Sequence, residues 1–185
     1  VAPPWFFFAV ASPLLVLLIA VYTQDQIERL AQGDFLTELA IRGGLFELIV
    51  IGGILQGFGE EPGWRGFALP VLRGRFGPLL ATLALFPVWL LWHLPFFLSR
   101  PELTLGSWLG FSIGIFSAAV WCTAIYDATR SLLMVALWHA LINITRGIAL
   151  AVSTAAFLAF GQVVLGVALL IILVWLYQRP GRYVS

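Results

Sequence analysis

The sequence predicts an all-α, polytopic bundle of helices that cross a membrane. Of its 185 residues, 61% are hydrophobic and only 10% are charged. Its mean hydropathy is +1.00, whereas a soluble domain is far more polar, with about 25% charged residues. Apolar runs recur at about 20 residues, the length that a helix needs to cross the hydrocarbon core. We therefore expect an integral membrane protein with one transmembrane domain over residues 1–185.

Apolar segments of sufficient length follow one another with short connections. The first, within "VAPPWFFFAVASPLLVLLIAVYT", is too long and too aromatic for a cleaved signal sequence and lacks a basic region before it. Because the chain begins with Val1 rather than Met, we expect further residues upstream. We predict about six membrane segments, at residues 4–23, 44–72, 77–98, 105–126, 130–151 and 154–177.

One polar stretch, "QDQIERLAQGDFLTELAIRGG" at residues 24–44, separates the first two segments. Its apolar side chains recur at helical spacing, which is typical of an amphipathic helix at the membrane surface. We therefore expect one interfacial helix here. Its apolar stripe comprises Ile27, Leu30, Phe35, Leu36, Leu39 and Ile41.

The charged residues of the loops predict an orientation and exclude some partners. All ten basic residues are arginine, and an excess of basic residues in loops indicates the cytoplasmic side. A net charge of +1 without a basic patch gives no sign of a nucleic-acid partner, and the single cysteine, Cys122, excludes an intrachain disulfide. Both ends of the chain are predicted to be cytoplasmic. That side carries Arg73, Arg75, Arg130, Arg179 and Arg182, against Arg29, Arg42 and Arg100 on the other.

The stretch "QGFGEEPGWRGFALP", residues 56–70, places charges inside an apolar segment. Glu61 and Arg65 are four residues apart with the acid first, the favoured order for a helical ion pair. Adjacent residues point about 100° apart on a helix, so this pairing leaves Glu60 free for chemistry. The alternatives are a new helix beginning at Pro62, with both carboxylates at its positive end, and a purely structural clamp. Pro62 predicts a kink or a break.

Other polar residues recur at membrane depth, where an ionisable group is costly and usually functional. Counting about 1.5 Å per residue, Glu60 and His93 lie about 20 Å from the arginine-rich side and His139 about 13 Å. Asn143 shares a helix face with His139. A carboxylate can take a proton from water, imidazoles can carry protons, and an amide can donate to an oxyanion. Taken singly, each histidine has an equally good interpretation as a packing residue. Glu47 and Arg146 also lie in or near apolar segments.

Two hydrolase motifs are absent or out of place. "GFSIG", residues 110–114, matches the G-x-S-x-G pattern, but that elbow requires a strand and a turn, and here it lies in an apolar helical run. A serine protease that uses Ser112 is a further alternative. The chain has no H-E-x-x-H motif.

Three motifs in order resemble those of the CPBP family, the CAAX-prenyl-protease-like and bacteriocin-processing intramembrane proteases also called Abi. They are "EEPGWRG" for E-E-x-x-x-R, "WHLPF" with the second-motif histidine, and "HALIN" for H-x-x-x-N. The resemblance covers residues 44–146, more than half of the chain, which we interpret as the catalytic core. One departure is Trp89, where the family's F-x-x-x-H motif has phenylalanine; the nearest is Phe86.

The resemblance implies an intramembrane endopeptidase in a prokaryotic cell membrane, open toward the cytoplasm. It implies that Glu60 acts on water, His93 assists, and His139 with Asn143 stabilises the oxyanion. Glu61 and Arg65 would support them. Either a divalent metal such as zinc, with Glu60, His93 and His139 as candidate ligands, or a metal-free glutamate mechanism fits. The expected substrate is a peptide or a lipidated protein reached from the lipid, in CAAX-type processing or in peptide or bacteriocin processing and immunity.

Three other classes of function use the same residues. Buried glutamate, histidine and arginine also form proton relays in transporters and channels. Two histidines can be axial ligands of haem in an electron carrier. A degenerate member without catalysis would be a binding protein, although the complete set of motif residues argues against it.

Overall fold

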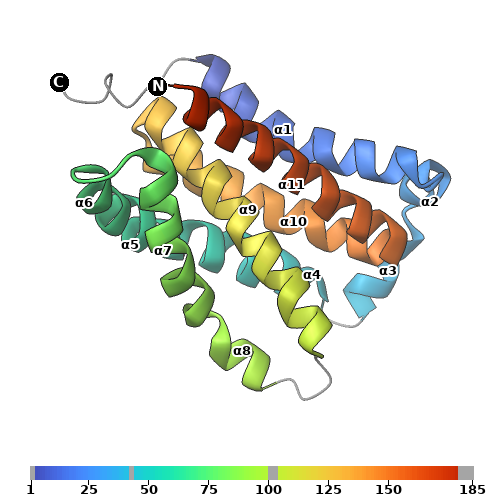
Figure 1. Cartoon of the computed structure of the whole chain (residues 1–185). Helices are drawn as coiled ribbons and strands as arrows, with labels where there is room; N and C mark the ends of the chain where they lie inside the picture. The colour runs from blue at the N-terminus through green and yellow to red at the C-terminus, as the bar shows by residue number, and fades with distance from the viewer. Residues whose placement is uncertain (1–2, 42–43, 100–103, 179–185) are drawn as a thin grey trace.

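In a computed structural model of the chain, residues 3–41, 44–99 and 104–178 are described, and they are almost entirely helical (Figure 1). Five helical spans are long and apolar enough to cross a membrane. They confirm the predicted all-α, polytopic bundle. They are α1 (Pro3–Thr23), α7 (Pro78–Trp92) continued by α8 (Leu94–Leu98), α9 (Leu105–Thr129), α10 (Leu132–Val152) and α11 (Thr154–Tyr177).

The predicted segment 44–72 is a helical path whose turns change type along its length. Short α-helical pieces alternate with wider π-helical ones, so the segment is not among the five uniform spans. Turns of this kind are frequent at functional sites. The consecutive pieces are α4 (Gly44–Phe46), η1 (Glu47–Phe58), α5 (Gly59–Gly63), η2 (Trp64–Ala68) and α6 (Leu69–Arg73).

The predicted single surface helix is two helices, α2 (Ile27–Gln32) and α3 (Asp34–Ile41). Gly33 between them has a φ of +72°, a left-handed conformation that ends α2 and that glycine adopts at little cost. Leu30 and Phe35 pack against the core of the bundle. The side chain of Ile41 and all of Arg42 lie outside the described residues, as do Arg100, Arg179 and Arg182.

Helix α10 is the centre of the bundle. It contacts α1, α9 and α11 on one side and the pieces η1, α5 and η2 on the other. The start of α1, the α6–α7 and α9–α10 turns and the end of α11 gather at one end of the bundle, and α2 and α3 lie at the opposite end (Figure 1). Ser131 caps the start of α10, because its side chain accepts a hydrogen bond from the backbone N–H of Met134.

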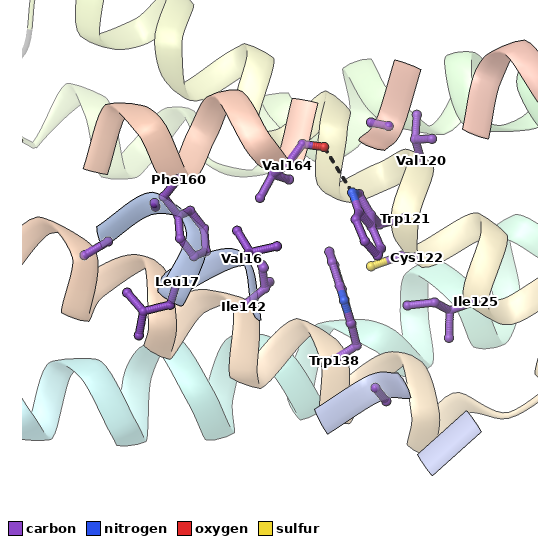
Figure 2. Packing of buried hydrophobic residues seen from close by; sticks show 14 of the residues in the cluster. Val16, Leu17, Val120, Trp121, Cys122, Ile125, Trp138, Ile142, Phe160 and Val164 are labelled. Carbon is purple, nitrogen blue, oxygen red and sulfur yellow. Dashed lines mark hydrogen bonds between the residues drawn. The ribbon is translucent and has the colours of Figure 1, made fainter. Parts of the chain in front are cut away.

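The main apolar core lies between α1, α9, α10 and α11. Trp121 of α9 and Trp138 of α10 stack with ring centroids 5.1 Å apart. The indole of Trp121 donates to the carbonyl oxygen of Val164, 3.1 Å away, and Cys122 is buried beside it (Figure 2). Both tryptophans are almost fully buried, so this core fixes the position of α10.

Glycines bring η1 unusually close to α10. A Cβ added at Gly57 would lie 2.6 Å from the Cβ of Ala140, and one at Gly53 would lie 3.0 Å from Ile144. Small residues permit such close approach between membrane helices. The contact sets the distance between the glutamates that follow η1 and the polar face of α10.

Candidate active site

The adjacent carboxylates Glu60 and Glu61 lie in α5, between the two π-helical pieces. Pro62 has no N–H to donate to the preceding turn, and this irregularity supports the change of helix type. The path remains helical through Pro62, so the predicted kink is a change of turn rather than a break. Because successive side chains point about 100° apart, the two carboxylates have different surroundings.

Glu61 is the centre of a buried charge network. Its Oε1 lies 2.9 Å from Nη1 of Arg65 and 2.7 Å from Nδ1 of His139. Glu61 and Arg65 are 0% exposed. The ion pair has the four-residue spacing predicted from the sequence, and His139 of α10 is a second partner that the spacing did not reveal.

Glu60 is half-buried and differs from Glu61 in every contact. Its Oε2 accepts a hydrogen bond from the indole of Trp89 at 2.7 Å and a longer one from the indole of Trp64 at 3.4 Å. Within the described part of the chain, no donor reaches the other oxygen, Oε1. Glu60 is thus held by one oxygen while the second is left for a small molecule such as water.

Trp89 contacts Glu60, Arg65 and both histidines of the site. It is fully buried, and the Arg65 guanidinium lies 4.3 Å from the centroid of its ring. The ring of His139 meets it edge-on at 5.5 Å, and the ring of His93 lies 6.0 Å away. A guanidinium above an indole face is a favourable cation–π arrangement.

His93 lies where α7 ends and α8 begins. Pro95 cannot donate to the carbonyl of Leu91, which favours an interruption at this point. The Nδ1 of His93 is 2.8 Å from the carbonyl oxygen of Trp89. Since a carbonyl only accepts, Nδ1 carries the proton and the lone pair of the neutral ring is on Nε2. Phe111 of α9 packs on this ring at 5.1 Å.

Asn143 lies one turn beyond His139 on α10. Its amide nitrogen donates to the carbonyl oxygen of Gly52 at 3.0 Å and to Oε1 of Gln56 at 3.2 Å. Both amide hydrogens are therefore directed at η1. This contact ties the polar face of α10 to the segment that carries the glutamates.

The structure thus brings the predicted residues together, but not in the predicted pairs. The resemblance implies that Glu60 acts together with His93 and His139, which would place both histidines against Glu60. In the structure His139 binds Glu61, His93 binds a backbone carbonyl, and the contacts of Glu60 are indoles. The physical reason is that η1 and α10 pack closely enough for Glu61, rather than Glu60, to face α10.

The resemblance leaves open a metal held by Glu60, His93 and His139. Among the residues that the structure describes, no three histidine, cysteine, aspartate or glutamate side chains form a group that could hold a metal ion. The three candidates Glu60, His93 and His139 are each engaged with a different partner. In this arrangement Glu60, His93 and His139 do not come together as a three-ligand site.

Ser112 does not lie at the strand-to-helix turn that the G-x-S-x-G motif requires. It lies inside the long helix α9, and its hydroxyl donates to the carbonyl of Trp108 at 2.8 Å. A hydroxyl bonded back to its own helix is a common arrangement for serine in a helix. A serine nucleophile of this motif needs a strand followed by a sharp turn, and Ser112 lies within a continuous helix instead.

The sequence did not predict the contacts that three residues of the site make, namely Trp89, Trp64 and Gln56. The sequence marks Trp89 only as a departure from the F-x-x-x-H motif, although replacing a phenyl ring by an indole adds an N–H donor. Trp64 lies four residues after Glu60, a helical spacing that could have suggested contact. Gln56 lies four residues before Glu60, but its partner Asn143 comes from another helix.

Comparison with known proteins found one family. The model of the family described as Rce1-like, type II CAAX prenyl endopeptidase, matches residues 38–145, more than half of the chain. The matched part includes Glu60, Glu61, Arg65, His93, His139 and Asn143. Comparisons with curated proteins and with solved structures found no match.

Proposed function

The chain belongs to the Rce1-like family of type II CAAX prenyl endopeptidases, and we propose that Glu60 activates the water with which it cleaves a peptide bond. Its family is one of intramembrane endopeptidases, which supports a protein or peptide substrate in the membrane. The apolar spans agree with an integral membrane protein.

The observation that carries the proposal is the contrast between the two glutamates. A general base must have an oxygen within reach of a water molecule. Glu61 is fully buried and shares Oε1 with Arg65 and His139. Each glutamate has one oxygen without a donor among the described residues, but Oε2 of Glu61 is buried, whereas Glu60 is half-buried. Oε1 of Glu60 is therefore the oxygen that takes the proton from water.

The other residues complete the reaction. The hydroxide attacks the scissile carbonyl carbon, whose oxygen becomes negative in the tetrahedral intermediate. Nε2 of His139 donates to this oxygen while Nδ1 stays bonded to Glu61. Asn143 adds a second donor: the N–H that donates to Gln56, in the longer of its two hydrogen bonds, donates to the oxyanion instead. The proton held by Glu60 passes to the leaving nitrogen with help from Nε2 of His93, and the peptide bond breaks.

Glu61 and Arg65 act by positioning. Their ion pair holds His139 through Nδ1, so that Nε2 points away from Glu61. Arg65 also packs on Trp89, which in turn holds Glu60. The mechanism runs on these side chains alone, and we expect cleavage to continue in the presence of EDTA.

We further propose that residues 44–146 form the catalytic core and that the arginine-rich end of the bundle is cytoplasmic. Arg73 and Arg130 lie at the turns that gather at that end (Figure 1). Basic residues in short loops favour the cytoplasmic side. A prenylated C-terminal peptide fits such a site, because its lipid can stay in the bilayer while the peptide reaches Glu60.

The test is the Glu60→Gln variant, with Glu47→Gln as a matched control on the same segment. Purified protein in detergent is given a labelled, farnesylated peptide that ends in a CAAX sequence. Loss of a general base costs about 10²- to 10⁴-fold in kcat, whereas the control should cleave like the wild type. Undiminished cleavage by Glu60→Gln would show that another group activates the water.

A further inference from the structure

Arg146 is a charged residue of the bundle that the mechanism does not use. It lies inside α10, six residues before the end of that helix, and it is exposed. Among the described residues it has no ion pair and no hydrogen bond of its side chain. An unpaired guanidinium at membrane depth is costly and generally marks a binding site or a path for charge.

The position of Arg146 on α10 places it with the catalytic residues. At about 100° per residue, Asn143 lies about 40° from His139 and Arg146 about 20° from it in the other sense. All three therefore share an arc of about 60° of the helix surface. The first two meet Glu61 and η1, so this arc faces the site.

The distance along the helix matches a short peptide. Seven residues of α-helix separate His139 from Arg146, which is about 10.5 Å. Three residues of extended peptide cover about 10 Å. A CAAX sequence ends three residues after its modified cysteine, and its last residue carries the free carboxylate of the chain.

We propose that Arg146 binds the terminal carboxylate of the substrate and so sets the cleavage point three residues from the end. This inference rests on the proposed function. A guanidinium donates two parallel hydrogen bonds to a carboxylate, a geometry that lysine or glutamine cannot reproduce. His139 holds the scissile carbonyl at one end of the released tripeptide, and Arg146 holds the carboxylate at the other.

The competing explanation is that Arg146 extends toward the lipid headgroups at the end of α10. The remaining six residues amount to about 9 Å of helix, which a long side chain can span. In that case Arg146 would bind lipid phosphate, and replacing it would not change the preference for a terminal carboxylate over a terminal amide. The two explanations differ in how the enzyme treats a substrate whose terminal charge has been removed.

The experiment compares one farnesylated peptide ending in Cys-Val-Ile-Met as a free acid and as a terminal amide. It is cleaved by the wild type, Arg146→Gln, Arg146→Lys and the control Arg75→Gln, which removes an exposed charge at the turn after α6. Hydrogen bonds to charged groups predict that the wild type and the control favour the acid about 10- to 100-fold in kcat/KM. Arg146→Gln should cleave the acid and the amide peptide with the same kcat/KM, equal to that of the wild type for the amide. The acid preference of Arg146→Lys should lie between those of the wild type and Arg146→Gln.

A binding measurement separates this inference from the proposed chemistry. The tripeptide Val-Ile-Met, as acid and as amide, is added to each protein and the thermal unfolding midpoint is followed. The acid alone should raise the midpoint of the wild type, and it should not raise that of Arg146→Gln. Equal cleavage of acid and amide by the wild type, or an acid preference that survives in Arg146→Gln, overturns the role of Arg146 while leaving Glu60 in place. Acid-specific binding without cleavage would sustain Arg146 and refute the proposed chemistry.

Discussion

Replacing Arg65 by methionine tests whether the buried network supports the site. Glu61 and Arg65 are 0% exposed, so the change leaves a carboxylate in the interior with His139 as its remaining side-chain partner. Removing one member of a buried ion pair costs about 3–5 kcal/mol of folding free energy, because the other charge stays desolvated. The lost contact with the Trp89 ring, worth about 2 kcal/mol when desolvated, overlaps with that cost. We expect a loss of about 3–5 kcal/mol in Arg65→Met.

The assay is unfolding by SDS in mixed micelles, followed by the fluorescence of the 8 tryptophans. The double variant Glu61→Gln/Arg65→Met should recover at least half of the loss, since replacing both partners leaves no uncompensated charge. Arg75→Met, an exposed arginine, is the control and should unfold like the wild type. The reasoning is refuted if Arg65→Met costs less than about 1 kcal/mol or if the double variant is as unstable as the single one.

Two further predictions concern Trp89 and Gly57. Trp89→Phe keeps the ring but removes the 2.7 Å hydrogen bond to Glu60, so kcat for the farnesylated peptide should fall about tenfold with KM unchanged. An unchanged kcat in steady-state kinetics would mean that the indole does not orient the base. Gly57→Ala forces a Cβ against the backbone of Ala140 and should cost about 1–3 kcal/mol in the SDS titration. Gly63→Ala, where a Cβ meets nothing within 4 Å, should not destabilise the protein, and equal losses in both would contradict the packing argument.

Local features of the sequence were sufficient to predict contacts between residues that lie on the same helix. The spacing of Glu61 and Arg65 predicted their ion pair, because residues four apart are neighbours on a helix surface. Hydropathy predicted the membrane helices, because helix length and bilayer thickness are fixed. The surface helix was predicted as one piece because the left-handed turn at Gly33 does not disturb the hydrophobic period.

Contacts between helices could not be deduced in the same way. Whether His139 meets Glu60 or Glu61 depends on the rotation of α5 relative to α10, and adjacent residues differ by about 100°. That rotation is set by the glycine contacts of η1 with α10 and by the wide turns on either side of α5. The hydrogen bond from Trp89 to Glu60 joins residues 29 positions apart, so no local sequence pattern predicts it.

The sequence by itself determined a helical membrane protein and the residue types of its site, because hydrophobic length and short-range spacing are properties of a single helix. Only the tertiary structure decided which residues of other helices each glutamate contacts. Glu61 is the fully buried partner of Arg65 and His139, and Glu60 is half-buried against the indole of Trp89. The reason is that the relative rotation and closeness of packed helices arise from many side-chain contacts at once, none of which is contained in the motif.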